Sequence, residues 1–126
     1  MESQHQLGDL QHAIMRVLWE LGEASVAEVH EALLESRGLA PTTIATMLTK
    51  LVKKEVVTFR KEGRRFIYVP AVDRRQVRLS MVGELAHRLF DGRAGDMVSH
   101  LLSEHAIDAD ELDRIKAMIE KMEESP

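Results

Sequence analysis

Residues 56–69, VVTFRKEGRRFIYV, alternate polar and apolar side chains, and this stretch most constrains the possible fold. The alternation, with β-branched and aromatic residues on both sides of Glu62-Gly63, predicts a β-hairpin whose turn lies at that pair. Pro70 should end the hairpin. Before it, apolar residues recur every three or four positions, as in helices that bury one face. The chain must therefore place one hairpin beside a set of amphipathic helices.

Three helices are expected before the hairpin, at about residues 9–21, 25–36 and 41–55. Gly22 and Gly38 should end the first two as left-handed caps, while Ser25 and Glu28 form a capping box. Pro41 suits the first position of the third helix. The expected buried faces are Leu10, Ala13, Ile14, Val17, Leu18 and Leu21, then Val26, Val29 and Leu33, then Ile44, Met47, Leu48, Leu51 and Val52. A short turn containing glycine joins the second and third helices, so the pattern predicts a helix-turn-helix with a wing.

The rest of the chain also reads as helical, with predicted helices from Asp73 to Phe90, from Asp96 to His105 and after Asp108. Residues 91–95 should break the first of these, and Asp73 and Asp108 should cap two of them. The predicted fold is therefore mainly α: a winged helix-turn-helix followed by an α-helical dimerisation region. We expect a DNA-binding domain at residues 1–72 and a dimerisation domain at residues 73–126.

The charge is unevenly distributed along the 126 residues. Residues 1–40 carry net −5, residues 41–75 net +6 and residues 76–126 net −5. A basic block between acidic flanks is typical of a localised contact with a polyanion. The chain has no cysteine, which excludes disulfides and thiolate metal sites and fits a cytoplasmic protein. No apolar run is long enough to suggest membrane insertion.

The third helix should bury Ile44, Leu48 and Leu51 and expose short polar side chains and lysines. Short side chains let a helix backbone approach bases, threonine hydroxyls can bond phosphates or base edges, and lysines reach phosphates. Four basic residues surround the hairpin turn and could grip phosphates or enter a minor groove. The alternatives are a solvated helix face and charge protection of an edge strand. The predicted DNA-binding residues are Thr42, Thr43, Ala45, Thr46, Thr49, Lys50, Lys53, Arg60, Lys61, Arg64 and Arg65.

The C-terminal helices carry apolar stripes that about fifty residues cannot bury alone. They could fold back on the winged domain or pair with a second copy, and two-fold pairing is the commoner solution. A dimer would read two symmetric half-sites. The predicted interface residues are Leu85, Leu89, Phe90, Met97, Leu101, Leu102, Leu112, Ile115, Met118, Ile119 and Met122.

Catalysis and metal binding find no support in the sequence. It lacks a phosphate-binding glycine loop, an HExxH motif and a nucleophile elbow. His100 and His105 are five residues apart, which fits one helical face poorly. We expect no enzyme activity, no catalytic residue, no cofactor and no metal site.

The segments LGDLQHAIMRVLW (7–19), TTIATMLTKLVKKEVV (42–57), RLFDGRAGDMVSHLL (88–102) and DADELDRI (108–115) resemble the penicillinase repressor family, the BlaI/MecI type of bacterial repressor. The resemblance spans nearly the whole chain. It implies a dimeric winged-helix repressor whose C-terminal helices interlock and which binds dyad-symmetric operators. It also implies that Thr42, Thr43, Thr46, Thr49 and Lys50 enter the major groove.

Three departures from the family pattern limit what the resemblance implies. The best-known members have an arginine where this chain has Ala45, so their operator sequence cannot be assumed. The copper-responsive branch uses C-terminal cysteines, which are absent here. The β-lactam branch is cleaved at an asparagine–phenylalanine bond, and the corresponding place, near Ser103-Glu104, does not match. A membrane sensor protease or another inducing signal therefore stays open as a partner.

Two other functional classes predict different features. A winged-helix module that binds protein instead of DNA should show an apolar or acidic face on the third helix. An enzyme should show clustered carboxylates or histidines in a pocket.

Overall fold

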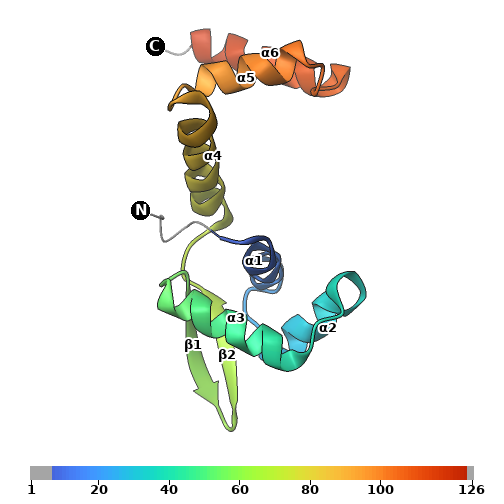
Figure 1. Ribbon diagram of the computed structural model, residues 1–126, viewed down its shortest axis with the longest axis vertical. Helices are drawn as coiled ribbons and strands as arrows, with labels where there is room; N and C mark the ends of the chain where they lie inside the picture. Colours follow the sequence, from blue (N-terminus) through green and yellow to red (C-terminus); the bar gives the residue numbers. More distant parts are fainter. Residues whose placement is uncertain (1–6, 125–126) are drawn as a thin grey trace. The chain divides into compact units, whose positions relative to one another are not determined.

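The computed structural model describes residues 7–124, which form six helices and one two-stranded antiparallel sheet (Figure 1). This confirms the predicted mainly α fold with a single hairpin. By internal contacts the chain divides into two compact units, one ending at Val82 and one beginning at Gly83. The elements are α1 (Asp9–Leu21), α2 (Val26–Arg37), α3 (Pro41–Lys53), β1 (Val57–Glu62), β2 (Arg65–Pro70), α4 (Arg74–Phe90), α5 (Ala94–Ser103) and α6 (Ala109–Glu124).

The predicted caps of the helix-turn-helix are present. Ser25 Oγ accepts from the Glu28 amide at 3.2 Å, and the Glu28 carboxylate accepts from the Ser25 amide at 3.0 Å. Gly38 ends α2 in the left-handed conformation, with φ at 60°. These signals lie within a few residues of one another, which is why the sequence alone could place the boundaries.

The third helix ends in a left-handed residue that is not glycine. Glu55 has φ at 65°, and the amides of Glu55 and Val56 donate to the carbonyls of Val52 and Leu51 at 2.9 and 3.2 Å. This pair of bonds is the Schellman arrangement, which satisfies the last carbonyls of a helix. It turns the chain sharply from α3 into β1, so that helix and wing lie close together.

The hairpin differs from the prediction at its turn. Glu62 pairs with Arg65, so the turn residues are Gly63 and Arg64 instead of Glu62-Gly63. Gly63 has φ at 62°, a conformation that glycine adopts without a Cβ clash. A further pairing was not predicted: Ala24, just before α2, exchanges two backbone hydrogen bonds with Tyr68 at 3.0 and 2.8 Å. The wing is thereby fastened to the loop between α1 and α2.

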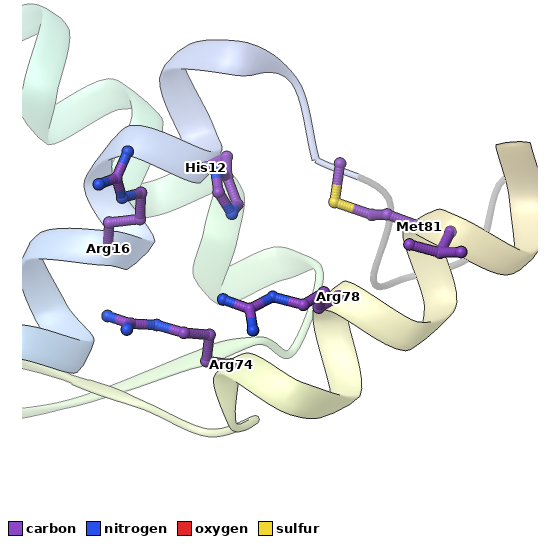
Figure 2. Close-up of a pocket in the computed structure, with 6 residues that line it drawn as sticks. His12, Arg16, Arg74, Arg78 and Met81 are labelled. Carbon is purple, nitrogen blue, oxygen red and sulfur yellow. The ribbon is translucent and has the colours of Figure 1, made fainter. Parts of the chain in front are cut away.

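The first turns of α4 lie beside α1 within the first unit (Figure 2). Asp73 caps α4, since its carboxylate accepts from the Gln76 amide at 2.7 Å, as predicted. Val77 is fully buried in the core, and Trp19 Nε1 donates to the Val72 carbonyl at 2.9 Å. Contacts therefore divide the chain inside α4, whereas the predicted division at residues 72 and 73 stays a prediction about independent folding units.

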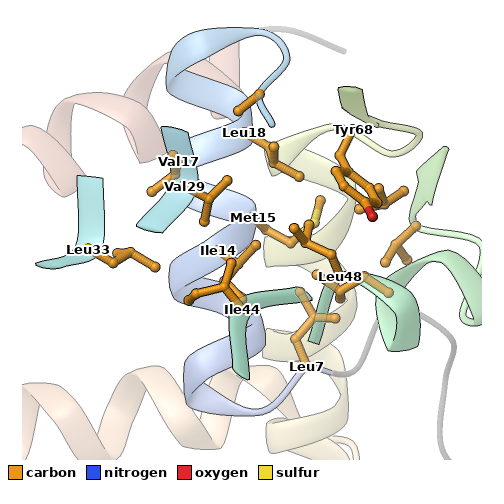
Figure 3. Packing of buried hydrophobic residues seen from close by; sticks show 14 of the residues in the cluster. Leu7, Ile14, Met15, Val17, Leu18, Val29, Leu33, Ile44, Leu48 and Tyr68 are labelled. Atoms are coloured by element: carbon orange, nitrogen blue, oxygen red, sulfur yellow. The ribbon is translucent and has the colours of Figure 1, made fainter. Parts of the chain in front are cut away.

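A continuous apolar core fills the first unit around α1 (Figure 3). Two positions on α1 differ from the predicted stripe. Leu21 is 54% exposed because the helix ends there, and Met15, which the stripe omitted, is fully buried. Otherwise the predicted pattern is confirmed, and the side chains with the least exposure include Ile14, Met15, Leu18, Val29, Ile44, Leu48, Leu51, Val56, Val57 and Val77.

The second unit has helices but little core. Neither α5 nor α6 contains a buried residue. α5 spans Ala94–Ser103 instead of the predicted Asp96–His105, because Asp96 pairs with Arg93 at 2.9 Å inside the first turn and His105 turns left-handed at φ 55°. The Asp108 cap of α6 is present, with Oδ1 accepting from the Glu111 amide at 2.8 Å. Over residues 7–124, no helix is both long and apolar enough to cross a bilayer.

Candidate nucleic-acid interface

The outer face of α3 carries the side chains that the sequence selected. Ile44, Leu48 and Leu51 are buried, which fixes the helix against the core and turns its other side outward. Thr42, Thr46, Thr49, Lys50 and Lys53 are exposed, while Thr43 and Ala45 are half-buried. No carboxylate occurs in the whole of α3. The exposed face therefore carries short polar side chains and lysines, and it is neither apolar nor acidic.

The hydroxyls of Thr46 and Thr49 already have partners. Each donates to the carbonyl four residues earlier, Thr42 and Ala45 respectively, at 3.0 Å. A hydroxyl has one proton to donate and two lone pairs that can accept. In this arrangement both hydroxyls can accept from base amino groups, but they could donate to a phosphate only by breaking the helix bond. This narrows the predicted role of the two threonines.

The lysines at the end of α3 do different things. Lys50 and Lys53 are exposed in the last turn of the helix, where cations also interact favourably with its dipole. Lys54 instead donates from Nζ to Gln11 Oε1 at 3.0 Å and so ties the end of α3 to α1. Lys50 and Lys53 are the two that face solvent and can reach an anion.

Arg60 on β1 is held by two carboxylates. Its guanidinium donates to both oxygens of Glu23 at 3.0 and 2.5 Å and to Glu62 at 2.8 and 2.5 Å. The hydrogen bonds to Glu23 and Glu62 raise the pKa of Arg60 above its ordinary range, and Arg60 in turn lowers the pKa of Glu23. Arg60 therefore braces the wing against the loop before α2, and DNA would have to compete with its carboxylates.

The remaining basic residues of the wing are exposed. Arg64 occupies the turn, Lys61 follows Arg60 on β1, and Arg65 begins β2. Lys61 Nζ lies 6.0 Å from the centre of the Phe66 ring, within cation–π distance. These three side chains carry the positive charge that the hairpin can offer to a partner.

Two aromatic residues that are not among the predicted DNA-binding residues join the candidate interface. Phe59 and Phe66 are 50% and 42% exposed, with ring centres 5.3 Å apart at 86°. With Thr49, Val52 and Tyr68 they line a hollow of about 210 Å³ between α3 and the wing. The cross-strand register puts Phe59, Lys61 and Phe66 on the strand face that looks toward α3. The alternation of residues along each strand indicates which side chains share a face. Only the pairing of the two strands shows that Phe59 and Phe66 lie on the same face.

Comparison with known proteins decides the family. The sequence model of the penicillinase repressor family matches residues 7–121. This chain belongs to that family. Relatives and a solved structure agree: the penicillinase repressor of Bacillus licheniformis is 28% identical over 116 residues, 92% of this chain and 91% of that protein. The transcriptional regulator BlaI of Mycobacterium tuberculosis is 34% identical over 119 residues, 93% of this chain and 85% of that protein.

A solved structure from the penicillinase repressor family is also similar to part of this chain. The solution structure of the DNA binding domain of the repressor BlaI is 35% identical, with a TM-score of 0.52, over 59% of this chain and 90% of that domain. This confirms the predicted winged-helix fold and the resemblance to the family. The family consists of transcriptional repressors and not of enzymes.

The second unit of this penicillinase-family chain exposes most of the predicted interface. Leu85, Leu89, Leu101, Leu102, Met118, Ile119 and Met122 are between 40% and 72% exposed. Phe90, Met97, Leu112 and Ile115 are half-buried. None of the eleven predicted interface residues is buried within the chain. Between residues 7 and 124, no group of three or more His, Asp or Glu side chains is placed to hold a metal.

Proposed function

We propose that this protein is a homodimeric transcriptional repressor that binds a dyad-symmetric DNA operator, with α3 in the major groove and the hairpin as a basic wing. The observation that carries the proposal is the exposed face of α3, which combines short polar side chains with Lys50 and Lys53 and has no carboxylate. A face of this kind lets the helix backbone approach the base edges while its cations meet phosphates.

Base contacts are assigned to the middle of α3. Thr46 and Thr49 keep their helix bonds and accept from base amino groups, and their methyl groups can contact thymine methyls. Ala45, which immediately precedes Thr46, is half-buried and has only a methyl group to offer. Where the family's best-known members carry an arginine, this chain can therefore make no bidentate contact to guanine. Its operator should differ at that position.

Phosphate contacts are assigned to Lys50, Lys53 and the tip of the wing. Lys61, Arg64 and Arg65 are exposed around the turn, so they can reach phosphates or a narrow minor groove. Arg60 contributes by holding the wing in place through Glu23. Phe59 and Phe66, at the mouth of the hollow beside Thr49, offer an apolar surface for a deoxyribose or a thymine methyl.

Dimerisation is assigned to the second unit because the described residues leave its apolar side chains half-buried or exposed. A two-fold dimer would bury the same face of both copies and present two recognition helices to two half-sites. Ser103 and Glu104, the place corresponding to cleavage in the β-lactam branch, lie exposed at the end of α5. Induction by a membrane sensor protease or by another signal is left open, and the protein would act in the cytoplasm.

The test begins with DNA fragments that the purified full-length protein selects from its own genome. Fluorescence anisotropy should show salt-sensitive binding to a palindromic fragment and much weaker binding to random duplex. We expect Lys50→Ala to weaken operator binding roughly tenfold and to lower the salt slope by about one, the loss of one phosphate contact. Arg64→Ala combined with Arg65→Ala should lower the slope by about two.

The matched control for these variants is Lys116→Ala, which removes an exposed lysine from α6. It should leave the affinity and the salt slope unchanged. Equal affinity for selected and random duplex would overturn the proposal and favour a protein-binding module, although the basic and polar face of α3 argues against that alternative.

A further inference from the structure

A second basic site lies in the first unit, on the side of α1 that meets α4. A pocket of about 430 Å³ is lined by His12 and Arg16 from α1 and by Arg74, Arg78, Met81 and Val82 from α4 (Figure 2). None of these residues belongs to the proposed DNA-binding surface of α3 and the wing. The volume falls within the range of pockets that bind small molecules.

The three arginines of this pocket have no acidic counterpart. In the described part of the chain, the arginines that form ion pairs are Arg37, Arg60, Arg88 and Arg93. The nearby carboxylate of Asp9 is engaged by Arg37 at 2.6 Å. Three guanidinium groups gathered around one hollow repel one another, and an anion placed among them would relieve that repulsion.

Part of the pocket wall is held in place by packing. The Arg74 guanidinium lies 5.6 Å from the centre of the Trp19 ring, and the His12 and Trp19 rings make a T-shaped contact with 6.0 Å between their centres. Trp19 is itself fixed by its hydrogen bond to the Val72 carbonyl at 2.9 Å. Stacking on an aromatic ring leaves the in-plane donors of a guanidinium free for an oxyanion. The site is therefore partly organised before a ligand binds.

We propose that this pocket binds a small organic anion with at least two negative charges and an apolar part. Arginines suit phosphate and carboxylate groups because their planar donors can pair with two oxygens at once. Met81 and Val82 provide an apolar wall on the side of α4, which inorganic phosphate would leave uncovered. α4 continues as one helix from this pocket to Phe90, so a ligand would restrain the start of the helix that leads into the second unit.

His12 offers a reporter of the site. Its pKa is lowered in the free protein by burial first and then by Arg16, Arg74 and Arg78, while Asp9 opposes the shift. An anion bound among the arginines would favour the charged imidazole and raise the pKa of His12. This can be followed by NMR in the unmodified protein, without relying on any variant.

The direct experiment is calorimetric titration of the full-length protein with phenyl phosphate at about pH 7.5, where a phosphomonoester carries close to two charges. Inorganic phosphate and benzyl alcohol at equal ionic strength supply the charge and the ring separately. We expect phenyl phosphate to bind, and both of the others to bind at least roughly tenfold more weakly. Arg16→Gln with Arg78→Gln should weaken phenyl phosphate binding by about tenfold or more.

Arg75→Gln is the matched control, since Arg75 is exposed on the same turn of α4 but does not line the pocket. It should bind phenyl phosphate like the unchanged protein, and Arg78→Gln alone serves if the double variant does not fold. The proposal is overturned if phenyl phosphate does not bind, if it leaves the pKa of His12 unchanged, or if the control loses as much affinity as the double variant. It is also overturned if duplex DNA displaces phenyl phosphate and the double variant loses DNA affinity, because the arginines would then be DNA contacts. A failure of phenyl phosphate to bind would leave the expected operator binding unchanged, and a failure of operator binding would leave the expected phenyl phosphate binding unchanged.

Discussion

The two units of this protein use similar apolar patterns in different ways. In the first unit, the stripes of α1, α2 and α3 meet one another and the wing, and side chains such as Ile14 and Leu48 are fully buried. In the second unit, apolar residues recur along one face of α5 and α6 in the same way, yet neither helix contains a buried residue. The difference shows that periodicity predicts a face to be covered without saying what covers it. In the first unit the chain itself does so, and for the second we propose another copy.

The largest effect should come from placing charge on the exposed stripe of the second unit. We expect Leu101→Asp with Ile119→Asp to weaken the dimer by about a thousandfold or more, because two carboxylates would be buried without partners. Sedimentation velocity over a range of concentrations measures this. Ser99→Asp with Ala117→Asp adds the same charge on the other sides of α5 and α6 and should leave the dimer intact. If the wild-type protein stayed monomeric at high concentration, a second copy would not be what covers the second unit.

The next largest effect concerns the core of the first unit. Leu48 is fully buried, so Leu48→Ala should lower the free energy of unfolding by about 3 kcal/mol through lost burial and a cavity. The cost should persist in the Leu101→Asp, Ile119→Asp background, since the first unit needs no second copy. Chemical denaturation followed by circular dichroism gives the value. Leu34→Ala, at a side chain 50% exposed on α2, should cost much less, and equal costs would contradict a self-contained core.

Features set by neighbouring residues were predictable from the sequence. The capping box at Ser25, the cap at Asp108 and the glycine that ends α2 are local patterns, and each is present in the structure. The exposed face of α3 followed from its 3.6-residue period in the same way. Small errors occurred at helix ends: α5 was predicted to begin at Asp96 but begins at Ala94, and Asp96 pairs with Arg93 in its first turn.

Features that join distant segments were not predictable. Arg60 was assigned to DNA because of its charge, and its partner Glu23 lies 37 residues earlier. The pairing of Ala24 with Tyr68 and the convergence of Arg16 with Arg74 and Arg78 depend in the same way on the tertiary fold. A sequence pattern shows which side chains face outward. Which of them meet is decided by packing, and so the braced wing and the arginine pocket required the structure.

An intermediate effect should distinguish the helix caps of the two units. Removing an N-cap typically costs about 1 kcal/mol. Ser25→Ala should lower the free energy of unfolding of the first unit by about that amount, because the capped turn is packed into the core. Asp108→Ala should instead speed hydrogen exchange at the start of α6 and leave the unfolding transition of the first unit unchanged. If Asp108→Ala destabilised the first unit as much as Ser25→Ala, the two units would unfold as one.

The smallest effect is expected from the ion pair that braces the wing. The hydrogen bond from Arg60 holds the pKa of Glu23 below its ordinary value of 4.5. A carboxyl whose pKa is lowered on folding stabilises the protein above its unfolded pKa, and that stabilisation is lost as the pH falls through the folded value. Glu23→Gln should therefore lower the melting temperature slightly near pH 7, and the difference from wild type should vanish near pH 2.

The matched control for Glu23 comes from the second unit. Glu84 pairs with Arg88 one turn along α4 at 3.6 Å, so the pair joins no separate elements. Glu84→Gln should change little at either pH, because exposed pairs within one helix contribute little to stability. The long-range pair also fixes the position of the wing, and Glu23→Gln should therefore weaken operator binding while Glu84→Gln does not. Equal behaviour of the two variants would mean that Arg60 does not brace the wing, and that its charge is available to DNA after all.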